Sequence, residues 1–271
     1  MYFWQLPGEL MSIKRIKTSI LHSWYHFRHS METWVDVFWN SALQMLVFSF
    51  IAAAFVGTTN ELYGAYIVVG MILWNIVWSA EYAMTIGVLW EIWSHSLSTL
   101  LISPLTLEEF LLGQAVSSLI KAITSVIVTA TIGAVVFHFS LLTLGWPLII
   151  YFIELFMFGG ASGMIVLSLI LRWGTDVQSL AWSLIFLVQP FGAVFYPVEI
   201  LPIQIRWIAY VVPTTYIFET IRGQLRDGSV NVNYLFIGTG LNIVYLIFSY
   251  VFLRTTFSAS KKSGAFARME G

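Results

Sequence analysis

Six apolar stretches of membrane-spanning length dominate this sequence and limit what the chain can fold into. Crossing the roughly 30 Å hydrocarbon core of a bilayer takes about 20 mostly apolar residues, because each helical residue rises about 1.5 Å. The stretches that meet this requirement are residues 34–56, 62–89, 111–137, 146–171, 178–196 and 233–253. Lipid cannot hydrogen-bond an open backbone, so each stretch should be an α-helix. The sequence therefore predicts an all-α integral membrane protein with six transmembrane helices.

The scarcity of charge leaves no room for a large soluble domain beside these helices. Only 10% of the 271 residues are charged, whereas about a quarter are charged in an ordinary soluble domain. We expect one membrane domain over residues 1–271, made of an interfacial segment (1–33), a six-span bundle (34–256) and a tail (257–271). The sequence has no cysteine, which excludes disulfides and cysteine-ligated metals. We expect no metal or cofactor in this chain and no removable signal peptide.

The distribution of Lys and Arg predicts the side of the membrane on which each end of the chain lies. Cytoplasmic flanks retain positive charge, and six spans place both termini on one side. That side would carry Lys14, Arg15, Lys17, Arg28, Arg172, Arg254, Lys261, Lys262 and Arg268. The opposite side would carry only Arg206, Arg222 and Arg226. Both termini are therefore expected to be cytoplasmic.

Two segments depart from a simple series of crossings. Residues 11–29 mix basic and apolar side chains at helical spacing, which is typical of an amphipathic helix lying in the headgroup region. A disordered basic tail is the alternative for this segment. Residues 200–212 and 214–225 are apolar enough to enter the membrane but too short to cross it. We expect them to form two short re-entrant helices between spans five and six, punctuated by Pro197, Pro202 and Pro213.

Polar side chains inside the predicted spans are candidates for a transport pathway. An unpaired charge in lipid costs several kcal/mol, which singles out Glu81 and Glu154. Alternatively, each of these carboxyl groups is protonated or hydrogen-bonded to a neighbouring helix with a purely structural effect. Asp36, Asn40 and Gln44 recur every four residues and form a polar stripe that should face protein or water. That stripe suits helix packing and pathway lining equally.

An aromatic surface lies in the second predicted span. Helical spacing places Trp74, Trp78 and Tyr82 on one side of the helix, with Glu81 beside them. One interpretation is a stacking surface for sugar rings or flat molecules, and the other is packing against another helix or subunit. We expect packing for Trp74 and a cavity lining for Trp78 and Glu81.

The connection between the second and third spans carries a helix-start signal. Thr106 can cap the third span while Glu109, three residues later, reaches back to it. Pro104 ends whatever structure precedes the cap. Residues 92–103 would then form a short amphipathic helix at the cytoplasmic surface.

Three stretches of the sequence carry a family resemblance. The first covers residues 91–114 and reads EIWSHSLSTLLISPLTLEEFLLGQ. The second covers residues 189–202 and reads QPFGAVFYPVEILP, and the third covers residues 213–222 and reads PTTYIFETIR. In this order they resemble the coupling segment, the end of the fifth span and the external signature of type-2 ABC exporter permeases. That group exports polysaccharides, teichoic acids, nodulation factors and drugs. Val188 and Phe191 depart mildly from its usual pattern.

The resemblance implies two sets of site residues. Residues 92–103 would insert as a knob into a groove of an ATPase, with an ordinary interfacial loop as the alternative. The implied coupling residues are Ser94, Leu97, Leu100, Leu101, Pro104, Glu108 and Glu109. The implied family signature comprises Pro202, Pro213, Thr214, Tyr216 and Arg222.

The sequence contains no phosphate-binding loop of the form GxxxxGK followed by Ser or Thr. ATP and Mg would therefore be bound by a separate ATP-binding cassette subunit. By analogy with the family, two identical or related permeases would pair with two ATPases in the plasma (inner) membrane of a prokaryote, among lipids and without nucleic acid. The expected function is ATP-driven export of a lipid-linked, glycan or amphipathic molecule. The alternatives are a proton-coupled secondary transporter that uses Glu81 and Glu154, and an intramembrane transferase.

Overall fold

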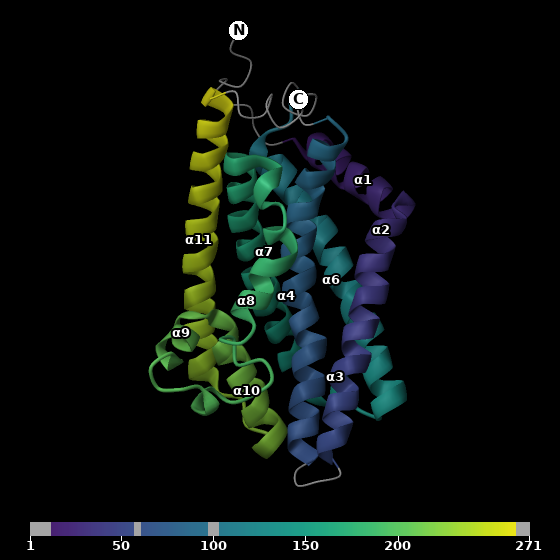
Figure 1. Ribbon diagram of the computed structural model, residues 1–271, viewed down its shortest axis with the longest axis vertical. Helices are drawn as coiled ribbons and strands as arrows, with labels where there is room; N and C mark the ends of the chain where they lie inside the picture. Colours follow the sequence, from purple (N-terminus) through teal and green to yellow (C-terminus); the bar gives the residue numbers. More distant parts are fainter. Residues whose placement is uncertain (1–11, 57–60, 97–102, 264–271) are drawn as a thin grey trace.

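A computed structural model describes residues 12–56, 61–96 and 103–263, and all regular elements within these ranges are helices (Figure 1). Five helical segments are long and apolar enough to cross a membrane. They are Val35–Ala54, Leu62–Trp93, Leu107–Val136, Pro147–Val177 and Val232–Ser263. The prediction of an all-α, multi-pass membrane protein is confirmed.

The N-terminal part of the chain forms a helix that lies across one end of the bundle. This helix, α1 (Ile13–His29), packs against the start of the third long helix. The chain then runs through α2 (Met31–Trp34), a π-helical stretch η1 (Val35–Asn40) and α3 (Ser41–Val56). Figure 1 shows α1 oblique to the long axis, whereas α3 runs along it. Residues 13–29 are thus helical, and their position at headgroup depth stays a prediction.

Two helices, α4 (Glu61–Trp93) and α7 (Pro147–Trp173), form the centre of the bundle. Most of each is buried, whereas less than a third of the apolar stretch is buried in α3, α6 (Leu107–Phe137) and α11 (Val232–Ser263). The 33 residues of α4 measure about 50 Å, which exceeds the roughly 30 Å hydrocarbon core. The length of α4 therefore exceeds what a single crossing of the hydrocarbon core requires.

Small residues let α4 and α7 approach closely. A Cβ atom added at Gly159 would lie 2.5 Å from the backbone oxygen of Val77. At Gly163 it would lie 2.7 Å from Cβ of Met84. Small residues four positions apart are a common device for close helix packing in membranes. The two glycines thus set the distance between the two central helices.

The chain returns along the bundle between α7 and α11, because these two helices are parallel. The Thr239 hydroxyl of α11 donates to the Glu154 carboxylate of α7. Further along both helices, Ser260 Oγ donates to the Leu171 backbone oxygen at 2.6 Å. The return begins with α8 (Leu180–Val188) at the end of the bundle where α7 finishes.

The continuous helix predicted over residues 178–196 does not form. α8 has nine residues and ends at Val188, and turns follow as far as residue 196. Pro190 has no backbone N–H with which to continue the helix. Ala193 adopts a left-handed backbone with a φ of 53°, which redirects the chain. The apolar composition of this segment is therefore not matched by one membrane-length helix.

Two short helices follow, as predicted, with shifted bounds. They are α9 (Arg206–Val211) and α10 (Pro213–Asp227). The first starts later than predicted because residues 201–205 form turns around Pro202. Gly228 ends α10 in a left-handed conformation with a φ of 74°. The remaining short elements are the 3₁₀ helices η2 (Leu141–Leu144), η3 (Gly174–Val177) and η4 (Val198–Ile200). Entry of α9 and α10 into the membrane stays a prediction.

The close seam between α4 and α7 can be tested with single methyl groups. Gly159→Ala and Gly163→Ala should each lower stability by about 1–3 kcal/mol, because the added Cβ overpacks the seam. Gly160→Ala is the control, since nothing lies within 4 Å of its Cβ position. Thermal unfolding in detergent, followed by tryptophan fluorescence, compares the three variants. Equal melting temperatures for all three would contradict the seam.

Candidate functional site

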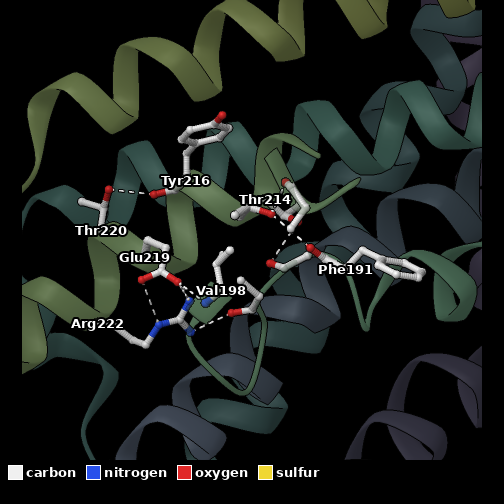
Figure 2. Close-up of polar contacts among 11 residues, drawn as sticks. Phe191, Val198, Thr214, Tyr216, Glu219, Thr220 and Arg222 are labelled. Carbon is white, nitrogen blue, oxygen red and sulfur yellow. Dashed lines mark hydrogen bonds and ion pairs between the residues drawn. The ribbon is translucent and has the colours of Figure 1, made fainter. Parts of the chain in front are cut away.

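The first cluster of polar contacts joins the start of α10 to the turn that follows α8 (Figure 2). Thr214 Oγ1 donates to the Gly192 backbone oxygen at 3.4 Å. Thr215 Oγ1 donates to the Ala209 backbone oxygen at 2.7 Å and lies 3.2 Å from the Phe191 backbone oxygen. Both threonines follow Pro213, which occupies the first turn of α10. The turn leaves the carbonyl oxygens of Phe191 and Gly192 outside any helix, and the two threonine hydroxyls lie within hydrogen-bond distance of them.

Arg222 is the central residue of this cluster. Its Nη1 donates to the Ala193 backbone oxygen at 2.6 Å, and its Nη2 donates to Glu219 Oε1 at 2.8 Å. Glu219 Oε1 also accepts from the Val198 backbone N–H at 2.8 Å. Arg222 is only 6% exposed. Its buried positive charge is therefore stabilised by the Glu219 carboxylate and the Ala193 carbonyl oxygen in place of water. We call Ala193, Val198, Glu219 and Arg222 the signature clamp (Figure 2).

The other predicted signature residues also hold backbone in place. The Tyr216 hydroxyl donates to the Tyr210 backbone oxygen at 2.9 Å, and its ring meets that of Tyr234 edge-on at 5.7 Å. The Pro202 backbone oxygen accepts from the Arg206 N–H at 3.1 Å. The signature residues thus fix the shape of the connection between α8 and α11. Their contacts position this connection and provide no reactive group.

The second cluster lies at the opposite end of the bundle, where α1 meets the start of α6 (Figure 1). Thr106 Oγ1 accepts from the Glu109 N–H at 3.2 Å, and Glu109 Oε2 accepts from the Thr106 N–H at 3.0 Å. The predicted capping box is therefore confirmed. Glu109 Oε1 additionally accepts from the Ser12 N–H at 2.8 Å and from Arg15 Nε at 2.9 Å. One carboxylate thus caps α6 and fastens α1 to it.

The same helix α1 also reaches the end of α4. His22 Nδ1 lies 3.6 Å from Glu91 Oε1, and Glu91 Oε2 accepts a hydrogen bond from Ser96. A cavity of about 480 Å³ opens between α1, the end of α4 and the start of α6. Its polar lining consists of Arg15, Thr18, Ser19, His22, Glu91, Ser96 and Ser103. This cavity lies beside the connection that was predicted to contact an ATPase.

The amphipathic helix predicted over residues 92–103 does not begin where expected. Ile92 and Trp93 are the last residues of α4, because Ile92 is buried in the core and continues the helix. The chain then turns, with His95 in the left-handed region at a φ of 53°. Three predicted coupling residues lie outside the described part of the chain: Leu97, Leu100 and Leu101.

The remaining predicted coupling residues lie at this end of the bundle. Ser94 Oγ donates to the Trp90 backbone oxygen at 2.7 Å, and Pro104 lines the 480 Å³ cavity. Glu108 Oε1 accepts from the Tyr250 hydroxyl of α11 at 3.0 Å. Consecutive carboxylates at the start of α6 therefore contact different helices, α11 through Glu108 and α1 through Glu109.

The predicted pathway residues of α4 are buried within this one chain. The rings of Trp78 and Tyr82 stack, with centroids 5.2 Å apart and planes 4° apart. Trp74 and Glu81 are completely buried. Among the described residues, neither carboxylate oxygen of Glu81 has a hydrogen-bond partner. A role of Trp78, Glu81 and Tyr82 in binding substrate stays a prediction.

The polar stripe of the first span divides into two parts. Asp36, in the π-helical stretch η1, accepts a hydrogen bond from the Tyr82 hydroxyl of α4. Asn40 Oδ1 accepts from Gln44 Nε2 at 3.0 Å, one turn further along the same helix. Asp36 therefore faces protein, whereas Asn40 and Gln44 bond to each other.

Glu154, the second charged residue singled out in a span, joins α7 to α11. Besides the bond from Thr239, its Oε2 accepts from Asn242 Nδ2 at 2.6 Å. Asn242 Nδ2 also lies 3.0 Å from the Glu154 backbone oxygen. This arrangement corresponds to the structural alternative, in which the carboxyl group bonds to a neighbouring helix.

Two basic residues of the sites were not predicted from the sequence. Lys121 of α6 is only 7% exposed and lines a small polar cavity with His22 and Gln114. Lys121 is a charged residue inside the third predicted span. The high cost of an unpaired charge in lipid, which singled out Glu81 and Glu154, could have singled out Lys121 as well. Arg15 carried no such signal, because its partner Glu109 is 94 residues away. Within the described residues, no group of three His, Asp or Glu side chains could hold a metal ion.

A known protein family matches most of this chain. The family model of the ABC-2 type transporter matches residues 20–225. The match extends from within α1 to within α10, so it includes the signature clamp and the capped start of α6. No curated protein matches the chain.

The signature clamp can be tested with two arginines on the same helix. Arg222→Gln should destabilise the fold by about 3 kcal/mol, because it leaves the Glu219 carboxylate without its buried partner. Arg226→Gln is the control, since Arg226 is exposed and its ion pair is with its neighbour Asp227, and it should leave stability unchanged. Thermal unfolding in detergent measures both. A loss of the same size in the two variants would show that the clamp does not hold α10.

Proposed function

Because the chain belongs to the ABC-2 type transporter family, we propose that it is the permease subunit of an ATP-driven exporter. The ABC-2 domain is the transmembrane component of such a transporter, and it normally pairs with an ATP-binding cassette subunit. The sequence has no phosphate-binding loop of its own. ATP and Mg would therefore be bound by that partner, and this chain would supply the pathway.

The contacts of Glu109 support this proposal independently of family membership. Its carboxylate joins the cap of α6 to Ser12 and Arg15 of α1. The adjacent Glu108 joins α6 to α11. A displacement of the connection between α4 and α6 would thus be transmitted to four helices: α1, α4, α6 and α11. This is the property expected of a segment that receives motion from an ATPase, to which we assign Ser94, Leu97, Leu100, Leu101, Pro104, Glu108 and Glu109.

We propose that the chain crosses the membrane six times. The fifth crossing would not be one continuous helix, because turns follow α8. Five helices have the length and apolar composition of spans, and the chain also has to return between the parallel helices α7 and α11. The end of α10 lies beside the start of α7, since Gln224 Nε2 donates to the Leu144 backbone oxygen at 2.8 Å. The return therefore covers the length of α7. With the Lys and Arg asymmetry, both termini would be cytoplasmic in a prokaryotic inner membrane.

The pathway would lie where two permease copies meet, and the rings of α4 are its candidate lining. In this chain Trp78 and Tyr82 are covered, and Tyr82 is bonded to Asp36 of the first span. Phe48 of α3 also stacks on Phe195 of the turn after α8, with centroids 4.6 Å apart. Access of a substrate to these rings would require the first span to move away from α4. The proposed substrate is lipid-linked, glycan or amphipathic, because aromatic rings suit sugars and apolar groups.

The exporter assignment is tested by purification with and without the partner. The chain alone should hydrolyse no ATP, because it lacks the phosphate-binding loop. When a tagged copy is isolated from its native membrane, an ATP-binding cassette subunit should co-purify, and the complex should hydrolyse ATP. Mass spectrometry identifies the partner, and a coupled assay measures the hydrolysis. ATPase activity in the isolated chain would contradict the assignment.

The coupling role of Glu109 is tested in that complex with adjacent carboxylates. Glu109→Gln keeps a residue that can complete the capping box but removes the charge that holds Arg15. It should lower transport per ATP hydrolysed by about tenfold, the equivalent of the roughly 1.5 kcal/mol that a hydrogen bond to a charged group contributes. Glu108→Gln, which does not touch α1, should change this ratio less. Equal ratios in wild type and Glu109→Gln would exclude α1 from coupling.

The orientation is tested by labelling single cysteines, which is practical because the chain has none of its own. Asn231→Cys lies just before α11 and should react with a membrane-impermeant reagent added outside intact cells. Ser263→Cys lies at the other end of α11 and should react only after the cells are opened. The reverse pattern would invert the proposed topology.

A further inference from the structure

A second groove lies between the last turns of α7 and α11, away from the coupling segment. Its volume is about 390 Å³. It is lined by Arg172, Phe252, Thr255, Thr256, Ser260 and Ser263. Figure 1 shows α11 at one edge of the bundle, so the groove lies at the periphery of the protein. The pathway and the signature clamp do not use these residues.

One wall of the groove is cationic. The guanidinium carbon of Arg172 lies 5.0 Å from the ring centroid of Trp173, an arrangement that restrains the side chain. Within the described residues, no ion pair involves Arg172. None of the residues that line the groove is acidic. This wall therefore suits an anion, and a guanidinium binds phosphate oxygens well.

The opposite wall offers hydrogen-bond acceptors. Thr255 Oγ1 donates its proton to the Phe252 backbone oxygen at 2.9 Å, and Ser260 Oγ donates to the Leu171 backbone oxygen at 2.6 Å. A hydroxyl has one proton, so these oxygens have only lone pairs left for a ligand. A ligand that fills the groove should bring an anionic group for Arg172 and O–H donors for the hydroxyl wall.

An apolar strip continues from the groove along α11. The rings of Phe248 and Phe252 stack, with centroids 6.0 Å apart, and Phe248 is 58% exposed. Phe248 lies one helical turn before Phe252, further from the end of α11 and toward its middle. A ligand with its polar group in the groove could lay a hydrocarbon chain on this strip.

We propose that this groove binds an anionic glycerophospholipid with hydroxyl groups on its headgroup, such as phosphatidylglycerol. The phosphate bonds to Arg172, the glycerol hydroxyls donate to Thr255, and an acyl chain lies on Phe252 and Phe248. A zwitterionic lipid with an ammonium group fits less well, because the lining has no carboxylate to balance that charge. The proposal goes beyond the exporter function and uses the proposed topology only to place the lipid in the cytoplasmic leaflet.

Native mass spectrometry of the purified full chain, titrated with phosphatidylglycerol, tests the site. Arg172→Gln should weaken retention of this lipid by about tenfold or more, as the loss of a charge-assisted hydrogen bond implies. Arg254→Gln is the matched control, because Arg254 is an exposed arginine of α11 outside the groove lining. Unchanged retention in Arg172→Gln, or the same loss in both variants, would overturn the proposal. Melting temperatures without lipid verify that each variant is folded.

A separate variant tests which lipid headgroup the groove binds. Thr255→Val keeps the side-chain shape but removes the acceptor oxygen, so it should weaken phosphatidylglycerol and leave phosphatidic acid, which lacks the glycerol hydroxyls, unchanged. Phosphatidylcholine should bind more weakly than phosphatidylglycerol to the wild type. Displacement of the lipid by millimolar inorganic phosphate would overturn the lipid assignment in favour of a free-phosphate site. These measurements need no ATPase partner, so their failure and a failure of the exporter proposal are distinguishable.

Discussion

The close contact between α4 and α7 is the constraint on which the rest of the bundle depends. Lipid tails are as apolar as leucine, so burial of apolar surface does little to hold helices together inside a membrane. Van der Waals contact has to do it, and Gly159 and Gly163 permit that contact by removing the side chains between the two backbones. α3 and α6 pack on α4, and α11 packs on α7. A shift of the central pair would therefore move α3, α6 and α11.

Several polar groups inside the helices link neighbouring helices. Asp36 joins the first span to α4, a bond of 2.8 Å between Ser41 and Ser125 joins it to α6, and Glu154 joins α7 to α11. Each link satisfies a polar group that lipid could not satisfy. Glu81 differs, because its carboxylate is buried without a hydrogen-bond partner among the described residues. It is thus the one predicted pathway carboxyl that the packing of this chain does not explain.

Elements whose signals are local could be predicted from the sequence, whereas elements that depend on distant contacts could not. Apolar length found five long helices, and the Thr106 capping box marked the start of α6. Residues 178–196 have the apolar length of one helix, but the left-handed backbone of Ala193 turns the chain within them. That turn is held by Arg222, 29 residues later. The attachment of α1 through Arg15 and Glu109 was likewise hidden by its separation of 94 residues.

The described chain begins and finishes at the same end of the bundle. Ser12, at the start of α1, bonds to the cap of α6, and Ser260, near the end of α11, bonds to the last turn of α7. A polypeptide with this property can be joined to a second copy of itself without an additional segment to change sides. Fusion of two copies in one gene would therefore preserve the orientation of each half. The position of its two described ends makes this fold suited to tandem duplication.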